Sequence, residues 1–194
     1  MLGLLAPTDP SWVDAVEGDL DGLLRDHAHC ELKAAQSALS LMARFAGEMP
    51  ELVAPLVALA HEETEHFDQV QRRIRERGGV MSLPESDLYV AALRKAAGRD
   101  HGDRPPLLDR LLVSALVEAR SCERFKLLAE RLRDASLRAF YADLMASEAR
   151  HFRLFSRLAE ERFGEGEARA RLRTLAEREA DIAGSLPLGP TVHG

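Results

Sequence analysis

The stretch HEETEH, residues 61–66, places two histidines and three glutamates within about two helical turns. Glu63 and His66 are three positions apart, so on a helix both side chains leave the same face. The stretch is therefore either a solvated acidic face that includes histidine or one half of a metal site. A single Glu-x-x-His pair often occurs by chance in a chain with 7 histidines, so the pair alone does not decide between the two.

A second pair, Glu148 and His151, lies in the stretch SEARHF and follows the first at the same spacing, 85 positions later. Each pair also has a glutamate about 30 residues before it: Glu31 precedes the first and Glu118 the second. If each glutamate and its pair lie on the two helices of a hairpin, a rise of about 1.5 Å per residue brings them to nearly the same height. The repeat therefore predicts two similar helical hairpins that present their acidic residues at one level.

The spacing of apolar residues and the turn residues predict a nearly all-helical chain without strands. We expect helices over residues 11–46, 51–77, 86–97, 106–133, 134–163 and 164–184, with Asp9 and Asp134 as caps. Two antiparallel hairpins joined by a connection of 27 residues, numbers 80–106, are typical of a ferritin-like four-helix bundle with additional short helices. We expect one domain over residues 1–194, with the bundle at about 11–163 and a C-terminal helix and tail at 164–194.

Composition and charge indicate a soluble cytoplasmic protein. Of the 194 residues 46% are hydrophobic and 30% charged, and no apolar run is long enough to cross a membrane. The N-terminus lacks the features of a signal peptide. Two cysteines, Cys30 and Cys122, do not form a disulfide framework. A net charge of −6 argues against general nucleic-acid binding but leaves room for a local basic patch.

Four carboxylates and two imidazoles at one level of a bundle are the ligand set of a di-iron or di-manganese centre. The candidate ligands are Glu31, Glu63, His66, Glu118, Glu148 and His151. No thiolate joins them, which argues against structural zinc. The alternative, charges on the surface of amphipathic helices, would leave glutamates facing a core without partners. Glu123 competes with Glu118 as a ligand, and His27 is either a partner of Glu31 or a structural histidine.

Three longer stretches carry a resemblance to a known family: DHAHCELKAAQSALSL (26–41), LVEARSCERFKLLAERL (116–132) and FYADLMASEARHFRLF (140–155). They resemble the bacterial tRNA hydroxylases that act on 2-methylthio-N6-isopentenyladenosine beside the anticodon, and the likeness covers roughly residues 7–163. The resemblance implies a ferritin-like fold, two iron ions and O2-dependent hydroxylation of the isopentenyl group. It also places the family's ligand motif on the six residues named above.

The resemblance implies partners as well. The substrate would be the anticodon loop of a tRNA, and two electrons are needed for each turnover. No Gly-x-Gly-x-x-Gly motif in the right context is present, so an external reductase or ferredoxin-like donor is implied. We expect a monomer or small homo-oligomer that does not bind membranes.

Two sets of residues are candidates for contact with the substrate. Because the isopentenyl group is apolar, we expect an apolar channel for it, and the candidates for its lining are Phe67, Phe125, Tyr141, Phe152 and Phe155. Phosphate contacts would come from Arg72, Arg73, Arg75 and Arg77, or from Arg94, Lys95, Arg99 and Arg104 in the connection. The simpler interpretations are core packing for the aromatic residues and an ion-paired surface for the basic ones.

Three other functions remain open at this point. An iron-storage protein or ferroxidase would share the ligands but would need a cage-forming surface. A quinone-ring hydroxylase would share them too and would need an apolar face for membrane docking. A purely structural bundle would bind no metal.

Overall fold

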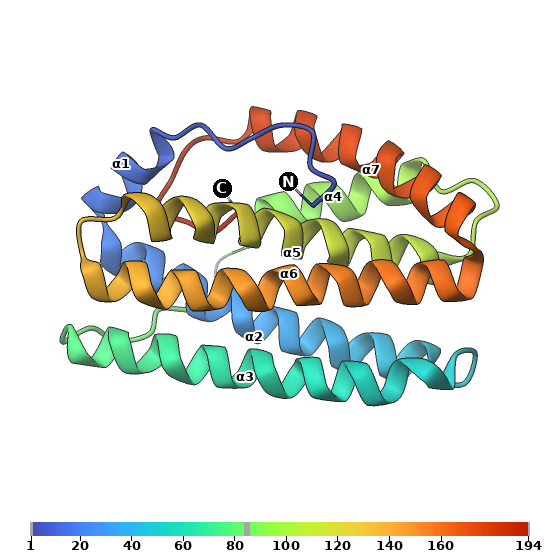
Figure 1. The fold of residues 1–194 in the computed structure, drawn as a ribbon, viewed down its shortest axis with the longest axis horizontal. Coiled ribbons are helices and arrows are strands. Elements are labelled where there is room, and N and C mark those ends of the chain that lie inside the picture. Colours follow the sequence, from blue (N-terminus) through green and yellow to red (C-terminus); the bar gives the residue numbers. More distant parts are fainter. Residues whose placement is uncertain (1, 84–85, 194) are drawn as a thin grey trace. The chain divides into compact units, whose positions relative to one another are not determined.

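The computed structural model describes residues 2–83 and 86–193, and every regular element within these ranges is helical (Figure 1). This confirms the all-α class expected from the sequence. The elements are α1 (Trp12–Gly18), α2 (Leu20–Phe45), η1 (Pro50–Leu52), α3 (Val53–Glu76), α4 (Leu88–Arg99), α5 (Pro106–Arg131), α6 (Ala135–Phe163) and α7 (Glu165–Ser185). None of the helices in the described ranges combines the length and the apolar character that a membrane span requires.

The chain divides into two compact units. The α2–α3 unit is built from Ala15–Ser86 and Gly189–Val192, and the α4–α7 unit comprises the N-terminal segment up to Asp14, Asp87–Leu188 and His193. Each unit contains one of the two expected hairpins, since α2 packs on α3 and α5 packs on α6 (Figure 1). The expected single domain over residues 1–194 stays a prediction.

The first helix is not continuous, and the expected helix over 11–46 was wrong at Asp19. The backbone of Asp19 is extended (φ −151°, ψ 73°), and its side chain accepts a hydrogen bond from the Gly22 amide at 2.8 Å. An aspartate that caps the next helix ends the previous one. The chain therefore forms a short α1 and then the long α2 that carries Glu31.

The other helix ends follow the sequence more closely. Gly78, with φ 77°, ends α3, and the amide of Gly79 donates to the carbonyl of Ile74 at 2.8 Å. Asp134 caps α6 as expected, because its side chain accepts from the amides of Ser136 and Leu137 at 2.8 and 3.1 Å. The α2–α3 hairpin therefore ends at Gly78, and the turn of the α5–α6 hairpin lies at Asp134.

The C-terminal helix α7 belongs to the core of its unit, where it contacts α4, α5 and α6. Gly164, with φ 87°, allows the sharp change of direction between α6 and α7. Arg171 is buried in α7 and donates to both oxygens of Asp109 in α5, at 2.7 and 2.9 Å. It also donates to the Ala97 carbonyl in α4 at 3.1 Å. One guanidinium thus connects three helices of the α4–α7 unit.

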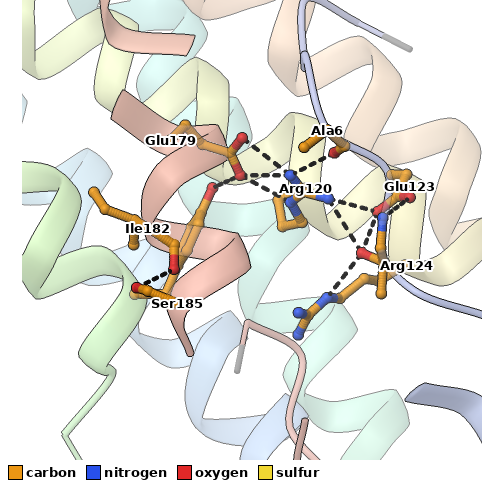
Figure 2. A network of polar contacts seen from close by, with 9 residues as sticks. Ala6, Arg120, Glu123, Arg124, Glu179, Ile182 and Ser185 are labelled. Atoms are coloured by element: carbon orange, nitrogen blue, oxygen red, sulfur yellow. Dashed lines mark hydrogen bonds and ion pairs between the residues drawn. The ribbon is translucent and has the colours of Figure 1, made fainter. Parts of the chain in front are cut away.

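A second buried arginine forms the centre of a larger polar network (Figure 2). Arg120 is 1% exposed and donates to the two oxygens of Glu179 in α7 at 2.8 and 3.0 Å. It donates further to Glu123 at 2.9 Å and to the Ala6 carbonyl at 3.0 Å. Tyr89 in α4 donates to the same Glu179 carboxylate at 2.9 Å. The network ties the N-terminal segment, α4 and α7 to α5.

Candidate metal centre

The α2–α3 unit brings its three predicted ligands together. Glu31 lies in the middle of α2, while Glu63 and His66 leave the same face of α3. We call these three residues the α2–α3 cluster. All three are buried, and the Nδ1 atom of His66 lies 3.3 Å from Glu63 Oε2 and 3.8 Å from Glu31 Oε2. Their donor atoms lie within 4.8 Å of one another, a spacing at which one ion could contact all three.

His27 holds one oxygen of Glu31. The residue lies one turn earlier on α2, is completely buried, and its Nε2 atom is 2.6 Å from Glu31 Oε1. Burial alone would raise the pKa of Glu31, but the contacts with His27 and His66 outweigh burial and hold the pKa well below its usual range. An ionised carboxylate only accepts hydrogen bonds, so His27 donates from Nε2. Of the two roles considered for His27, the structure supports the direct partner of Glu31.

The two ring nitrogens of His66 face different groups. Nδ1 faces Glu31 and Glu63, while Nε2 lies 3.9 Å from the partly exposed Glu62. Burial alone would lower the pKa of His66, but its contacts with Glu31 and Glu63 raise the pKa to about 9. A metal ion would take the place of that proton at Nδ1. A carboxylate beside the other nitrogen is a common arrangement for metal-binding histidines, where it fixes the orientation of the ring.

The α4–α7 unit repeats the arrangement. Glu118 from α5 meets Glu148 and His151 from α6, and all three side chains are buried. The Nδ1 atom of His151 lies 3.8 Å from Glu118 Oε2 and 4.0 Å from Glu148 Oε1. We call these residues the α5–α6 cluster. As in the other unit, the donor atoms lie within 4.8 Å of one another, and Nδ1 is the nitrogen that faces the carboxylates.

Glu123, the competing candidate, has a different environment. Its carboxylate accepts from the amide and hydroxyl of Thr8 at 2.8 and 2.6 Å and from Arg120 at 2.9 Å. Figure 2 shows Glu123 directed at this network. Glu118 is the glutamate of α5 that lies near His151, at 3.8 Å. The geometry therefore favours Glu118, as the hairpin spacing suggested.

The donor set suits the metal that the sequence indicated. Each cluster offers two carboxylates and one imidazole, a combination that fits iron or manganese. Neither cluster includes a cysteine. Two buried carboxylates close together repel each other unless a cation lies between them. The six residues would hold such an ion in each unit, and their role as ligands stays a prediction.

The aromatic candidates do not form one group. Phe125 of α5 and Tyr141 of α6 are buried, with ring centroids 5.2 Å apart. Each lies seven positions, two turns or roughly 10 Å, from the glutamate of the cluster on its own helix. Phe155 is buried in α6, and Phe67 is half-buried in α3. Phe152 is half-buried and lies against Gly3, where a β-carbon would come 3.8 Å from its Cζ.

The predicted basic patch at the end of α3 is partly neutralised. Arg72 pairs with Asp68, and Arg77 with Asp21 at 2.6 Å. Arg73 donates to the Gln69 carbonyl at 3.0 Å. In the connection, Arg104 pairs with Glu167 at 3.0 Å. The ion-paired surface described above as the simpler interpretation thus accounts for several of these arginines, and their contact with phosphates stays a prediction.

The sequence interpretation missed a buried hydrogen-bond chain in the α4–α7 unit. His193, in the tail, lies 2.9 Å from Asp87 through Nδ1 and 3.0 Å from the Ser121 hydroxyl through Nε2, and it stacks on Tyr89. Residues this far apart in the sequence carry no local signal. The sequence predicts only a tail beyond residue 184 and no role for it, yet its last described residue, His193, is buried.

Known proteins resemble the chain over most of its length. A family model described as tRNA-(MS[2]IO[6]A)-hydroxylase (MiaE) matches residues 2–194. Two relatives are named tRNA 2-(methylsulfanyl)-N(6)-isopentenyladenosine(37) hydroxylase. The one from Pseudomonas putida is 40% identical over 79% of this chain and 73% of that protein. The one from Salmonella typhimurium is 31% identical over 92% of this chain and 83% of that protein.

A solved structure is also similar. It is described as Protein 43 with aldehyde deformylating oxygenase activity from Synechococcus, and it matches with a TM-score of 0.89 and 41% sequence identity. The match covers 98% of this chain and 95% of the other. The all-helical fold with its two hairpins is thus the ferritin-like fold expected from the sequence.

Proposed function

This chain belongs to the MiaE family of tRNA hydroxylases, and from this premise we propose that it hydroxylates the isopentenyl group of 2-methylthio-N6-isopentenyladenosine in tRNA. The observation that carries the proposal is the repeated cluster of two glutamates and one histidine, buried once in each hairpin. We further propose that the α2–α3 cluster and the α5–α6 cluster together hold two iron ions. Iron bound there would supply the activation of O2, with two electrons from a reductase or ferredoxin-like donor.

The protein's own side chains define what such a centre can do. Both histidines present Nδ1 to carboxylates, at 3.3 Å in the α2–α3 cluster and 3.8 Å in the α5–α6 cluster. The six side chains are almost completely buried. Burial excludes bulk water, so reducing equivalents are directed to the substrate and not lost to side reactions. A buried site with these donor atoms suits an oxygenase better than a solvent-exposed site would.

The modified adenine must reach the centre from the anticodon loop. Bases in single-stranded loops leave their stack readily, and an apolar isopentenyl chain fits a channel with apolar and aromatic walls. We propose that Phe125 and Tyr141 contribute to such a wall, because they lie two turns from Glu118 and Glu148 on the same two helices. The adenine beside the anticodon as substrate, a cytoplasmic location and a monomer or small homo-oligomer complete the proposal.

One experiment tests the function directly. Purified full-length protein is analysed for iron, then incubated with tRNA from a strain that lacks the hydroxylated base, O2 and a reductant, and the nucleosides are identified by mass spectrometry. We expect about two iron ions per chain and gain of one oxygen on the isopentenyl group. Glu63→Ala and Glu148→Ala should each hold fewer than two iron ions and should not hydroxylate the base, while Glu65→Ala, at a residue that is 61% exposed, should keep the iron and the activity. Hydroxylated tRNA from the two ligand variants would overturn the proposal.

The similar Synechococcus structure supports one alternative, an oxygenase that acts on an aldehyde. Its described activity and its 41% identity to this chain are the specific observations in favour. The same protein is incubated with a long-chain aldehyde, and released formate is measured. Formate without hydroxylated nucleoside would replace the tRNA with an aldehyde as substrate. Iron storage would instead show a large cage-like assembly by solution mass and no product in either assay.

A further inference from the structure

The two clusters differ in the residue one turn before their first glutamate. In the α2–α3 unit this residue is His27, whose Nε2 lies 2.6 Å from Glu31 Oε1. In the α5–α6 hairpin the matching position, four before Glu118, is the half-buried Ser114. Within residues 2–83 and 86–193, no hydrogen bond of Ser114 or Glu118 corresponds to the one from His27 to Glu31. The two otherwise similar carboxylates are therefore supported differently.

The residue one turn before the histidine also differs. Glu62 precedes His66 and places its carboxylate 3.9 Å from Nε2. The matching residue before His151 is Ser147, whose hydroxyl accepts a hydrogen bond from Arg150 at 2.9 Å. At the matching position the acidic Glu62 is thus replaced by a serine, which is a second difference between the two hairpins.

The effect on a bound ion follows from the geometry of Glu31. His27 occupies Oε1, and Oε2 remains directed toward His66, 3.8 Å from Nδ1. Because His27 fixes the carboxylate before the ion arrives, less conformational freedom is lost when the ion binds. Loss of such a partner typically lowers metal affinity by about 10- to 100-fold.

We propose that the two clusters are unequal metal sites: the α2–α3 cluster binds iron more tightly and fills first, and His27 is the positioning residue that sets this order. The inference rests on the proposed iron centre but adds to it, since an iron centre with two equal sites would satisfy the proposed function. His27 acts through Glu31 and does not touch the ion. Loading in a fixed order would give a state with one iron before the active state with two.

Binding of ferrous iron to the metal-free full-length protein tests the order. Under argon, isothermal titration calorimetry should show a tight and a weak phase of one ion each. His27→Leu removes the hydrogen bond at similar volume, and we expect it to weaken the tight phase 10- to 100-fold while the weak phase stays unchanged. The matched control Ser114→Ala should change neither phase. His27→Gln, which restores an N–H donor, should recover part of the affinity.

Two ligand variants assign the phases independently of whether His27→Leu folds. Glu118→Ala should abolish the weak phase and keep the tight one, and Glu31→Ala should abolish the tight phase. The proposal is overturned if the wild type binds both ions with one affinity, if Glu118→Ala removes the tight phase, or if His27→Leu leaves the tight phase unchanged. A wild type that binds no iron at all would instead refute the proposed iron centre.

Discussion

Replacement of Glu123 by alanine should destabilise the protein without removing iron. The Glu123 carboxylate is 12% exposed and accepts three hydrogen bonds, two from Thr8 and one from Arg120. A hydrogen bond to a charged group contributes about 1.5–3 kcal/mol, but the losses do not add up fully because Arg120 keeps its ion pair with Glu179. We therefore expect the free energy of unfolding to fall by about 3 kcal/mol.

In a chain of this size about 1 kcal/mol corresponds to roughly 2–4 °C in Tm, so Glu123→Ala should melt roughly 6–12 °C below the wild type. Circular dichroism at 222 nm measures the Tm, and iron analysis of the same preparation measures the metal. The matched variant Glu118→Ala should behave in the opposite way. It should hold about one iron ion in place of two, and its metal-free form should be at least as stable as that of the wild type, because one of the mutually repelling carboxylates is gone.

The Tm and the iron content of the two variants together distinguish the roles of the two glutamates of α5. Loss of iron from Glu123→Ala with an unchanged Tm would refute the assignment of Glu118 as the ligand. Full iron content in Glu118→Ala would do the same. Glu123→Gln serves as a further control, since it retains an acceptor for Thr8 and should show a smaller loss of Tm than the alanine variant.

The free energy of unfolding of the metal-free protein should depend on His66, whose pKa is raised from 6.5 to about 9 in the folded state. The stabilisation by protonated His66 is full below pH 6.5 and is lost as pH rises through 9. Urea unfolding at a series of pH values should show this loss, and it should be absent in His66→Gln. Replacing Arg72, Arg73 and Arg75 by alanine should weaken tRNA binding and leave the iron content unchanged. The slope of log K against log salt concentration should become shallower by up to about three, and an unchanged affinity would exclude this stretch from the RNA interface. Tyr141→Leu should keep iron and tRNA affinity but release more peroxide per hydroxylated base, and an unaltered ratio would place the channel elsewhere.

The clusters could be predicted because helical geometry is local. Glu63 and His66 meet through a spacing of three residues, and the height of Glu31 follows from counting residues on both sides of a turn. The break at Asp19 was missed for a related reason. The apolar periodicity on its two sides matches one helix, and a single aspartate that caps the second helix outweighs that periodicity.

The buried ion pairs could not be predicted in this way. Arg120 and Glu179 are 59 positions apart, and both belong to residue types that are mostly exposed. Each is stable in the interior only because the other is there. A periodic pattern reports which face of a helix is apolar, but it does not report which distant charge will meet a charge on that face. For this reason the sequence predicts α7 only as a C-terminal helix outside the bundle, although it supplies Glu179 and Arg171 to the interior.

These ion pairs also bear on the metal cluster, although they touch none of its residues. Helix α5 carries Glu118 on one face, and Arg120, two positions later, points to nearly the opposite side. Arg120 is held there by Glu179 of α7 and by the Ala6 carbonyl, so these contacts restrict the rotation of α5 about its axis from the side away from the cluster. A rotation that relaxed this pairing would also move Glu118 away from His151, which lies 3.8 Å from it. The position of Glu118 in the α5–α6 cluster is therefore linked to charges that bind no metal, and we infer that this role offsets the cost of burying them beside an apolar core.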